Sequence, residues 1–352
     1  HIIGGILLFG AVLIGGRLRQ GSMNTTAFSF GPLGAKGFAV LNMLQLIGWT
    51  SIMIYDAMLA LQELAPLSPM IWTIAIGALV ILWLFIGLHN TGYIQAIVSV
   101  LLLGLTLYMG AHMISQWPSE GILLTSGNMS FIAALELSIA MPLSWLPLIS
   151  DYTRESKKPF SASLTSATVY TVTSIVMYTL GLSAAIFGGG DSIITIMMNA
   201  GLGLAGLIVI IFSTVTTTFM DAYSAGVSST TIYNGASSKG IAVIVTIVGT
   251  IAAILYPMDD ITDFLYLIGS VFAPMIAILL ADYFINRQQV QTLSAYLVRG
   301  LIWAVSVGLY HYMLHSESTI GATLPAFTMA FVVTAIVGFI SKTAHTSAEI
   351  KQ

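Results

Sequence analysis

The chain has 352 residues, of which 57% are hydrophobic and only 7% are charged. Because soluble domains carry about 25% charged residues, this composition cannot cover the surface of a water-soluble protein. The formal net charge of −3 gives no reason to expect a nucleic-acid partner. The absence of cysteine excludes disulfides, thiolate nucleophiles and thiolate metal ligands. The composition therefore indicates an integral membrane protein.

Apolar runs of roughly twenty residues recur along most of the chain, and each is long enough for one helix to cross a bilayer. We therefore expect an all-α protein with a single polytopic domain over residues 1–352. In chain order, the runs predict eleven membrane-spanning helices, at 2–16, 37–62, 70–88, 93–114, 129–150, 165–187, 203–232, 240–256, 261–281, 295–314 and 320–341.

The distribution of positive charge orients these helices. If the spans alternate between the two sides, all 11 Lys and Arg residues fall in loops on one face, and the loops of the other face contain no positive charge. Because cytoplasmic loops are enriched in Lys and Arg, we expect the basic face and the C-terminus to be cytoplasmic. The first span then begins outside, as it would if one preceding helix were absent. We therefore expect twelve spans in the intact protein.

The predicted helix 37–62 carries polar residues within helical reach of one face. An indole ring can stack on a flat heterocycle while amide groups read the edge of that heterocycle. Alternatively, the Trp is a packing residue or an interfacial anchor, and the Asp is hydrated near the outer end of the span. The residues, with one methionine among them, are Asn42, Gln45, Trp49, Met53 and Asp56.

The predicted helix 129–150 contains Pro142 and Pro147, which flank Trp145. Two prolines remove two backbone donors and clash with preceding carbonyls, so we expect this helix to break within the membrane. Unwound backbone is tolerated there only where it is buried or lines a wet cavity, so the break indicates a binding site, although a simple kink is the alternative. Glu136 precedes the break and is either a functional acid or a satisfied structural one.

The predicted helix 203–232 carries Thr214, Thr217, Thr218 and Asp221 at positions i, i+3, i+4 and i+7. This spacing gathers three hydroxyls and one carboxyl on one face, where they can supply oxygen ligands to a hard cation. The hydroxyls can instead bond to carbonyls of their own helix. The carboxyl in the same stripe favours the cation site, with the three threonines as its ligands.

Two literal motif matches do not indicate an enzyme. Residues 201–206 spell G-x-G-x-x-G, but no strand precedes them. His311 and His315 have i, i+4 spacing, but no third metal ligand accompanies them. The sequence also contains no extramembrane domain large enough for ATP hydrolysis, so any uphill transport must use an ion gradient.

Short segments at 23–30 and 192–199 each lie between two long spans, as in two halves of opposite topology. This organisation divides the chain into the rest of a first repeat, a second repeat and two C-terminal helices, at 1–114, 129–281 and 295–341.

Five short motifs are distributed along nearly the whole chain: Gly31-Pro32-Leu33-Gly34, Leu44-Gln45-Leu46-Ile47-Gly48-Trp49, Ser150-Asp151-Tyr152-Thr153-Arg154, Tyr223-Ser224-Ala225-Gly226 and Ala281-Asp282-Tyr283-Phe284. In order and spacing they resemble the nucleobase:cation symporter-1 family, and within it the CytX-type hydroxymethylpyrimidine permeases most closely. The resemblance implies alternating access, sodium coupling and a LeuT-like inverted repeat of five plus five helices with two more at the end. Eleven of those twelve helices are present here, and a chain that truly lacked the first should not transport.

The resemblance also implies roles for individual residues. Trp49 matches the tryptophan that stacks on the substrate ring, and the hydroxyl pair of the sodium site falls on Thr217 and Thr218, or one position earlier on Thr216. Met53 replaces a glutamine of the hydantoin transporter. Phe219-Met220-Asp221 replaces a stretch that is often rich in asparagine.

We therefore expect a symporter that imports a pyrimidine such as hydroxymethylpyrimidine for thiamine synthesis. Gln45, Trp49, Met53, Glu136, Trp145 and Asp221 are the candidate substrate residues. No cofactor or obligatory protein partner is expected beyond the lipid bilayer and a coupling sodium ion, for which a proton is the alternative. The rival functions are a permease for cytosine, another nucleobase or allantoin, and, from another class, a channel or an intramembrane enzyme. We expect the bacterial inner membrane as the location.

Overall fold

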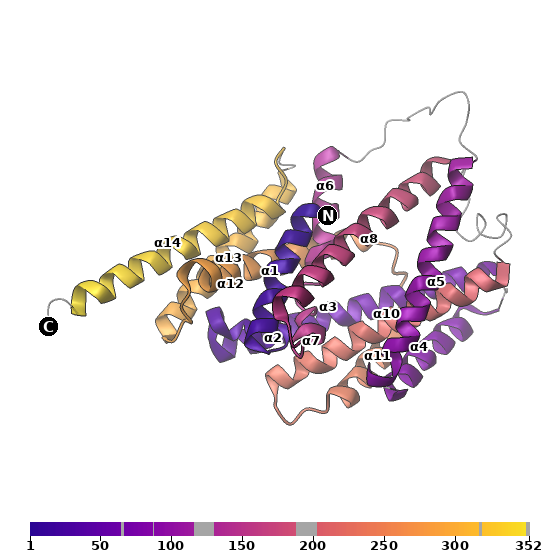
Figure 1. Ribbon diagram of the computed structural model, residues 1–352, viewed down its shortest axis with the longest axis horizontal. Coiled ribbons are helices and arrows are strands. Elements are labelled where there is room, and N and C mark those ends of the chain that lie inside the picture. The colour runs from indigo at the N-terminus through magenta and orange to yellow at the C-terminus, as the bar shows by residue number, and fades with distance from the viewer. Residues whose placement is uncertain (65–66, 87, 116–129, 188–202, 317–318, 350–352) are drawn as a thin grey trace.

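The computed structural model describes residues 1–64, 67–86, 88–115, 130–187, 203–316 and 319–349, and every regular element in them is helical. Figure 1 shows these elements as a set of long helices. In chain order they are α1 (Ile2–Leu18), α2 (Ser22–Thr25), α3 (Ala27–Leu64), α4 (Pro69–Ile86), α5 (Leu88–Ser115), α6 (Phe131–Leu143), α7 (Ser150–Thr153), α8 (Pro159–Phe187), α10 (Gly203–Ile232), α11 (Ser238–Leu255), α12 (Ile261–Leu280), the π-helix η1 (Ala281–Asn286), α13 (Leu293–His315) and α14 (Thr323–Glu349).

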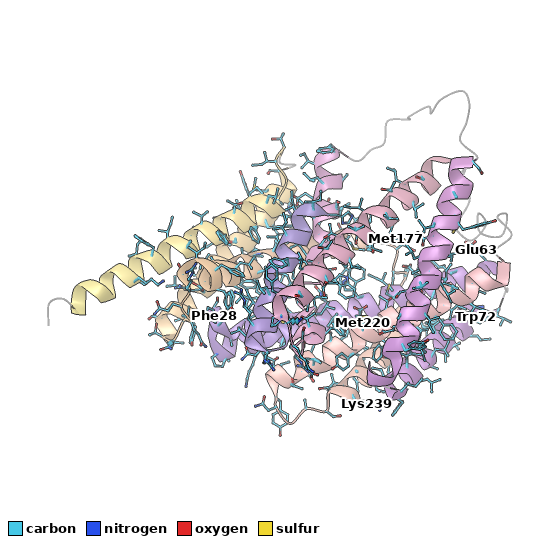
Figure 2. The ribbon with its side chains drawn as sticks, in the orientation of Figure 1. Phe28, Glu63, Trp72, Met177, Met220 and Lys239 are labelled. Carbon is cyan, nitrogen blue, oxygen red and sulfur yellow. The ribbon has the colours of Figure 1, made fainter. Side chains whose placement is uncertain are left out.

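The protein is a multi-pass membrane protein. Within the described residues, nine helices are long and apolar enough to cross a membrane, and α1 and α6 are shorter apolar helices. Many large apolar side chains project outward from these helices (Figure 2), among them Leu82, Phe85 and Leu107, each more than half exposed. An outer surface of this kind is stable against lipid and unstable against water.

Each of the predicted spans corresponds to a helix, but three predicted starts, those of α3, α5 and α8, are too late. Helix α5 begins at Leu88, five residues before the predicted start at 93. Helix α8 begins at Pro159, six residues before the predicted start at 165, because proline is well suited to the first turn of a helix. Helix α3 begins at Ala27 and bends at Gly31, where φ is 69°. A side chain at Gly31 would meet the ring of Tyr296, with the Cβ only 2.6 Å from the nearest ring atom. The predicted short segment 192–199 lies outside the described residues.

The helices pack in two main groups. Helices α3, α4, α10 and α11 pack against one another, and α1 packs against α6, α7 and α8. Helix α12 contacts α6 of the second group and also packs against α13 and α14, which lie together at one end of the molecule (Figure 1). The unwound segment between α6 and α7 therefore belongs to the second group, whereas α3 and α10 belong to the first.

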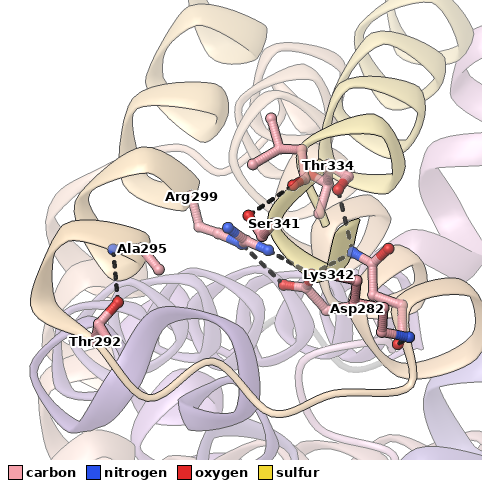
Figure 3. A network of polar contacts seen from close by, with 9 residues as sticks. Asp282, Thr292, Ala295, Arg299, Thr334, Ser341 and Lys342 are labelled. Atoms are coloured by element: carbon pink, nitrogen blue, oxygen red, sulfur yellow. Dashed lines mark hydrogen bonds and ion pairs between the residues drawn. The ribbon is translucent and has the colours of Figure 1, made fainter. Parts of the chain in front are cut away.

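A buried ion pair attaches the last two helices to α12 (Figure 3). Arg299 of α13 donates to Asp282 of η1 at 3.0 Å, and the two side chains are 6% and 0% exposed. Asn286 donates to Asp282 at 2.8 Å and to the carbonyl oxygen of Thr334 at 3.1 Å. Lys342 donates to the carbonyl of Asn286. Because every charge here has a partner, the pair can be buried without an uncompensated desolvation cost.

Candidate functional site

The predicted break lies between α6 and α7. The α-helical hydrogen bonding ends near Leu143, and residues 144–149 form a series of turns. In that stretch the backbone N–H groups of Trp145 and Leu146 donate three residues back, at 3.2 and 3.1 Å. The break is confirmed, and its physical reason is that Pro142 and Pro147 have no N–H to continue the ladder.

Two amide side chains of α3 contact the carbonyls of the unwound segment. Asn42 donates to the carbonyl oxygen of Pro147 at 3.1 Å and to the hydroxyl of Ser228 on α10 at 2.9 Å. Gln45 donates to the carbonyl oxygen of Ser144 at 3.0 Å. The side chains of α3 therefore hold the segment in addition to its own turns, and the segment lies directly against α3.

Gln45 keeps one unused acceptor. Its Oε1 atom is buried and accepts no hydrogen bond from any described residue, and the side chain as a whole is 4% exposed. A buried acceptor without a donor is costly and needs an explanation such as a bound ligand or water. The sequence indicated Gln45 as a candidate, but only the structure shows which atom is available.

Trp49 lies one helical turn beyond Gln45 and is 9% exposed. Its ring meets that of Phe264 on α12 at a centroid distance of 5.4 Å and an angle of 71°. Met53, one turn further, is half-buried, and Asp56 is exposed, in agreement with the hydrated alternative. Sequence reasoning did not identify Phe264, because nothing local distinguishes it from other apolar residues of its helix.

Trp145 lies within the unwound segment and is partly buried. Its ring lies 5.7 Å from that of Tyr170 on α8, measured between ring centroids. Trp145 also packs against two apolar clusters of buried residues, so it lies where these two clusters meet.

The threonine stripe of α10 bonds to its own helix. Thr217 donates to the carbonyl oxygen of Ser213 at 2.9 Å, and Thr218 donates to that of Thr214 at 2.8 Å. These hydroxyl protons therefore bond to carbonyls of their own helix, which is the alternative considered from the sequence. The oxygen lone pairs of these hydroxyls stay available to a cation.

Asp221 continues the stripe and is 6% exposed. No hydrogen bond or ion pair joins it to another residue in the described part of the chain. A charged group in such surroundings is costly unless a cation or a proton neutralises it. Asp221 is thus the most conspicuous electrostatic feature of α10.

Glu136 makes hydrogen bonds of the kind that the structural alternative expected. Its Oε2 atom accepts from the backbone N–H of Thr323 at 2.9 Å and from the Thr323 hydroxyl at 2.5 Å. These bonds satisfy donors at the first turn of α14, where a carboxylate is favoured. Gly321, with φ of 77°, allows the chain to pass beside the carboxyl.

The fold matches known transporters, although no family model matches the sequence. The chain superposes on the structure of Mhp1, a nucleobase-cation-symport-1 family transporter, in a closed conformation with bromovinylhydantoin bound. The TM-score is 0.80 and the sequences are 17% identical, and the match covers 97% of this chain and 84% of that chain. A Na⁺-coupled sialic acid symporter in a substrate-bound outward-open state gives a TM-score of 0.68, 17% identity, and coverage of 97% and 82%. The LeuT-like fold predicted from the resemblance is thereby confirmed.

The sequence is also similar to curated cytosine permeases. It is 25% identical over 185 residues to the cytosine permease of Escherichia coli strain K12, covering 51% of this chain and 44% of the permease. The same values describe the cytosine permease of Escherichia coli O157:H7. The match spans a little under half the length of these relatives.

Proposed function

We propose that this chain belongs to the nucleobase:cation symporter-1 family and imports a pyrimidine by cation-coupled symport. The observation that carries this proposal is the unpaired Oε1 of Gln45 beside the unwound segment, one helical turn from Trp49. A flat heterocycle stacked on the indole would donate a ring N–H or amino hydrogen to that oxygen. A polar site of this kind discriminates strongly, because a ligand without the matching group leaves it unpaired.

The substrate site would have apolar walls. Met53 lies further along α3 and Trp145 lies on the unwound segment, and both are only partly buried. Such a site would combine stacking surface with few polar groups, which is typical of small-molecule pockets. Hydroxymethylpyrimidine, a precursor in thiamine synthesis, is the substrate that we infer from the motif resemblance.

The coupling ion would bind beside α10. Sodium would be held by the oxygens of Thr214, Thr217 and Thr218, with the charge of Asp221 in the same stripe. Sodium and substrate would then raise each other's affinity by the same factor, typically about 5- to 150-fold. The alternative is a proton carried by Asp221 itself, which would also remove the cost of burying its charge.

The distribution of charge supports an orientation. The basic loops and the C-terminus would face the cytoplasm of a bacterium, with the protein in the inner membrane. Under this orientation, Arg154 and the other charges after α7 lie at the cytoplasmic end, and Glu136 lies toward the outside.

The test is uptake of labelled hydroxymethylpyrimidine by cells that express the full-length gene. Sodium is replaced by choline in one arm, and excess unlabelled cytosine competes in another. Saturable, sodium-dependent uptake that cytosine barely inhibits supports the proposal. An uptake rate that is the same with choline as with sodium contradicts sodium coupling and favours coupling to a proton at Asp221. Non-saturable flux would indicate a channel.

Cytosine is the second candidate substrate. The similarity to the Escherichia coli cytosine permeases favours it, and cytosine offers the same stacking face and amino group as the pyrimidine above. Strong inhibition by cytosine in the competition arm, together with uptake of labelled cytosine, would identify cytosine as the substrate.

A further inference from the structure

Asp151 lies at the start of α7, directly after the unwound segment, and is 6% exposed. Its Oδ1 atom accepts from the backbone N–H of Ser22 on α2 at 2.9 Å. Its Oδ2 atom accepts from the hydroxyl of Ser224 on α10 at 2.8 Å. One carboxylate thus joins three elements that are more than 70 residues apart in the sequence.

Neighbouring contacts reinforce this junction. The hydroxyl of Ser22 accepts from the backbone N–H of Ser150 at 3.0 Å. Tyr152 donates to the carbonyl oxygen of Met220 on α10 at 2.5 Å, and Figure 2 labels Met220 near the middle of the molecule. A Cβ at Gly21 would lie 2.8 Å from Asp151 Oδ1. The loop before α2 therefore approaches the carboxylate as closely as a residue without a side chain allows.

The junction lies between the two groups of helices. Near the site, Asn42 and Gln45 of α3 bond to carbonyls of the unwound segment. Further along, past the segment, Asp151 and Tyr152 bond to α10. Arg154 follows α7 at the end of the molecule that carries the basic loops. The bond between Asp151 and Ser224 joins α7 to α10, so any opening that separates these two helices would break it.

We propose that Asp151 is a positioning residue of the transport cycle, whose carboxylate holds α7 against α2 and α10 and keeps the basic end closed until substrate release. This inference rests on the proposed transport function and goes beyond it. Hydrogen bonds to an ionised carboxylate are about twice as strong as neutral ones, so the charge on Asp151 sets the strength of the closure.

The ionisation of Asp151 is adjustable in the physiological range. Burial raises the pKa of Asp151 to about 7, while the bonds from Ser224 and Ser22 and the charge of Arg154 oppose the rise. The other titratable groups that face the carboxyl are the phenols of Tyr152 and Tyr223. Below about pH 7 the neutral acid binds its two donors more weakly. Closure at the basic end is therefore expected to loosen as the pH falls through 7.

The 352 residues contain no cysteine, and any cysteine elsewhere in the full-length protein is replaced by serine so that a single reporter thiol remains. In the full-length protein, Val227→Cys places a reporter thiol on α10 beside Gly21 and the Asp151 carboxylate, and a membrane-impermeant maleimide is applied from the side that the basic loops face. Asp151→Asn and Ser224→Ala are each expected to raise the labelling rate about tenfold, the effect of losing one charge-assisted hydrogen bond. Thr230→Ala is the matched control, because that hydroxyl bonds only to its own helix, at Val227.

The pH profile separates this role from simple packing. Because maleimide reacts with the thiolate, each labelling rate is divided by that of a free thiol at the same pH. The normalised rate of the protein with Asp151 intact is expected to rise as the pH falls through about 7, whereas that of Asp151→Asn is expected to stay high throughout. Labelling of both variants at the parent rate, in protein that elutes as a folded species, would overturn the proposal. Because the assay needs no substrate, its failure is distinct from failure of the proposed pyrimidine uptake. If Asp151→Asn does not fold, the labelling rate of Ser224→Ala is decisive, because this variant removes the contacts of Ser224 to Asp151 and Tyr152 and keeps the carboxylate.

Discussion

Gln45 donates to the carbonyl oxygen of Ser144 at 3.0 Å, across 99 residues of sequence. This bond satisfies a carbonyl that the proline-broken helix leaves without a helical donor, and it fixes the orientation of the Gln45 amide. The same amide therefore presents its oxygen on the other side, unpaired. One side chain both supports the unwound backbone and offers an acceptor to a ligand.

Replacement of Gln45 separates these two roles. We expect Gln45→Leu to weaken substrate binding by about 10- to 100-fold, because the ligand loses its acceptor and meets an apolar group. Asn42→Ala is the comparison, since it removes the bonds to Pro147 and Ser228 and the 3.3 Å contact from the Gln45 amide, but no unpaired acceptor. Binding of labelled substrate to purified protein measures both. Equal losses of affinity in the two variants would mean that Gln45 acts only through the segment.

Trp49 is expected to stack on the substrate. We expect Trp49→Ala to reduce substrate affinity about tenfold or more through lost stacking and contact area, with little change in sodium affinity measured without substrate. Trp49→Phe keeps an aromatic face and should retain most of the affinity. The measurement is a substrate titration at saturating sodium. An unchanged affinity in Trp49→Ala would exclude stacking on this ring.

Asp221 is expected to control coupling. We expect Asp221→Asn to keep the fold, because the neutral amide removes the cost of a buried charge. It should also abolish or weaken the cation dependence of substrate binding. Asp56→Asn is the control, since Asp56 is exposed and is not part of the threonine stripe. Substrate affinity is measured as a function of sodium at fixed pH, and then of pH without sodium.

The two series identify the coupling ion. Loss of the sodium effect alone would assign Asp221 to the sodium site, and loss of the pH effect alone would assign it to the proton. Retention of both effects in Asp221→Asn would contradict any coupling role for this carboxyl.

The Asp282–Arg299 pair is expected to govern the stability of the C-terminal helices. We expect Arg299→Met to lower the free energy of unfolding by about 3–5 kcal/mol, because it leaves Asp282 as an unpaired buried charge. The double variant Asp282→Leu/Arg299→Met should recover most of this loss. Thermal unfolding in detergent measures the effect, with the exposed Arg287 as the site of a control substitution. A double variant less stable than Arg299→Met would contradict this account.

Some features of the site were predictable because their causes are local. The break in the helix follows from Pro142 and Pro147 themselves, since a proline lacks an N–H wherever the helix lies. The placement of Trp49, Gln45 and the threonine stripe on helix faces follows from the 3.6-residue period. For the same reason the apolar runs located the spans to within a few residues, except where α3, α5 and α8 begin earlier and α14 ends later than the apolar runs.

The roles of the buried polar residues were not predictable in this way. Glu136 was a candidate for reading substrate, and only the packing of α14 against α6 shows it bonded to Thr323. Asp151 stood in a recognisable motif with no role, and its partners Ser22 and Ser224 come from two other helices. Neither pairing leaves a periodic signal in the sequence.

The sequence by itself determined that this protein spans a membrane with many helices, where one helix breaks, and which faces carry polar groups. Only the tertiary structure decided which of those polar groups are already satisfied and which are not. The physical reason is that apolar length and proline act within one helix, whereas a hydrogen bond such as that from Gln45 to Ser144 depends on how two distant helices meet.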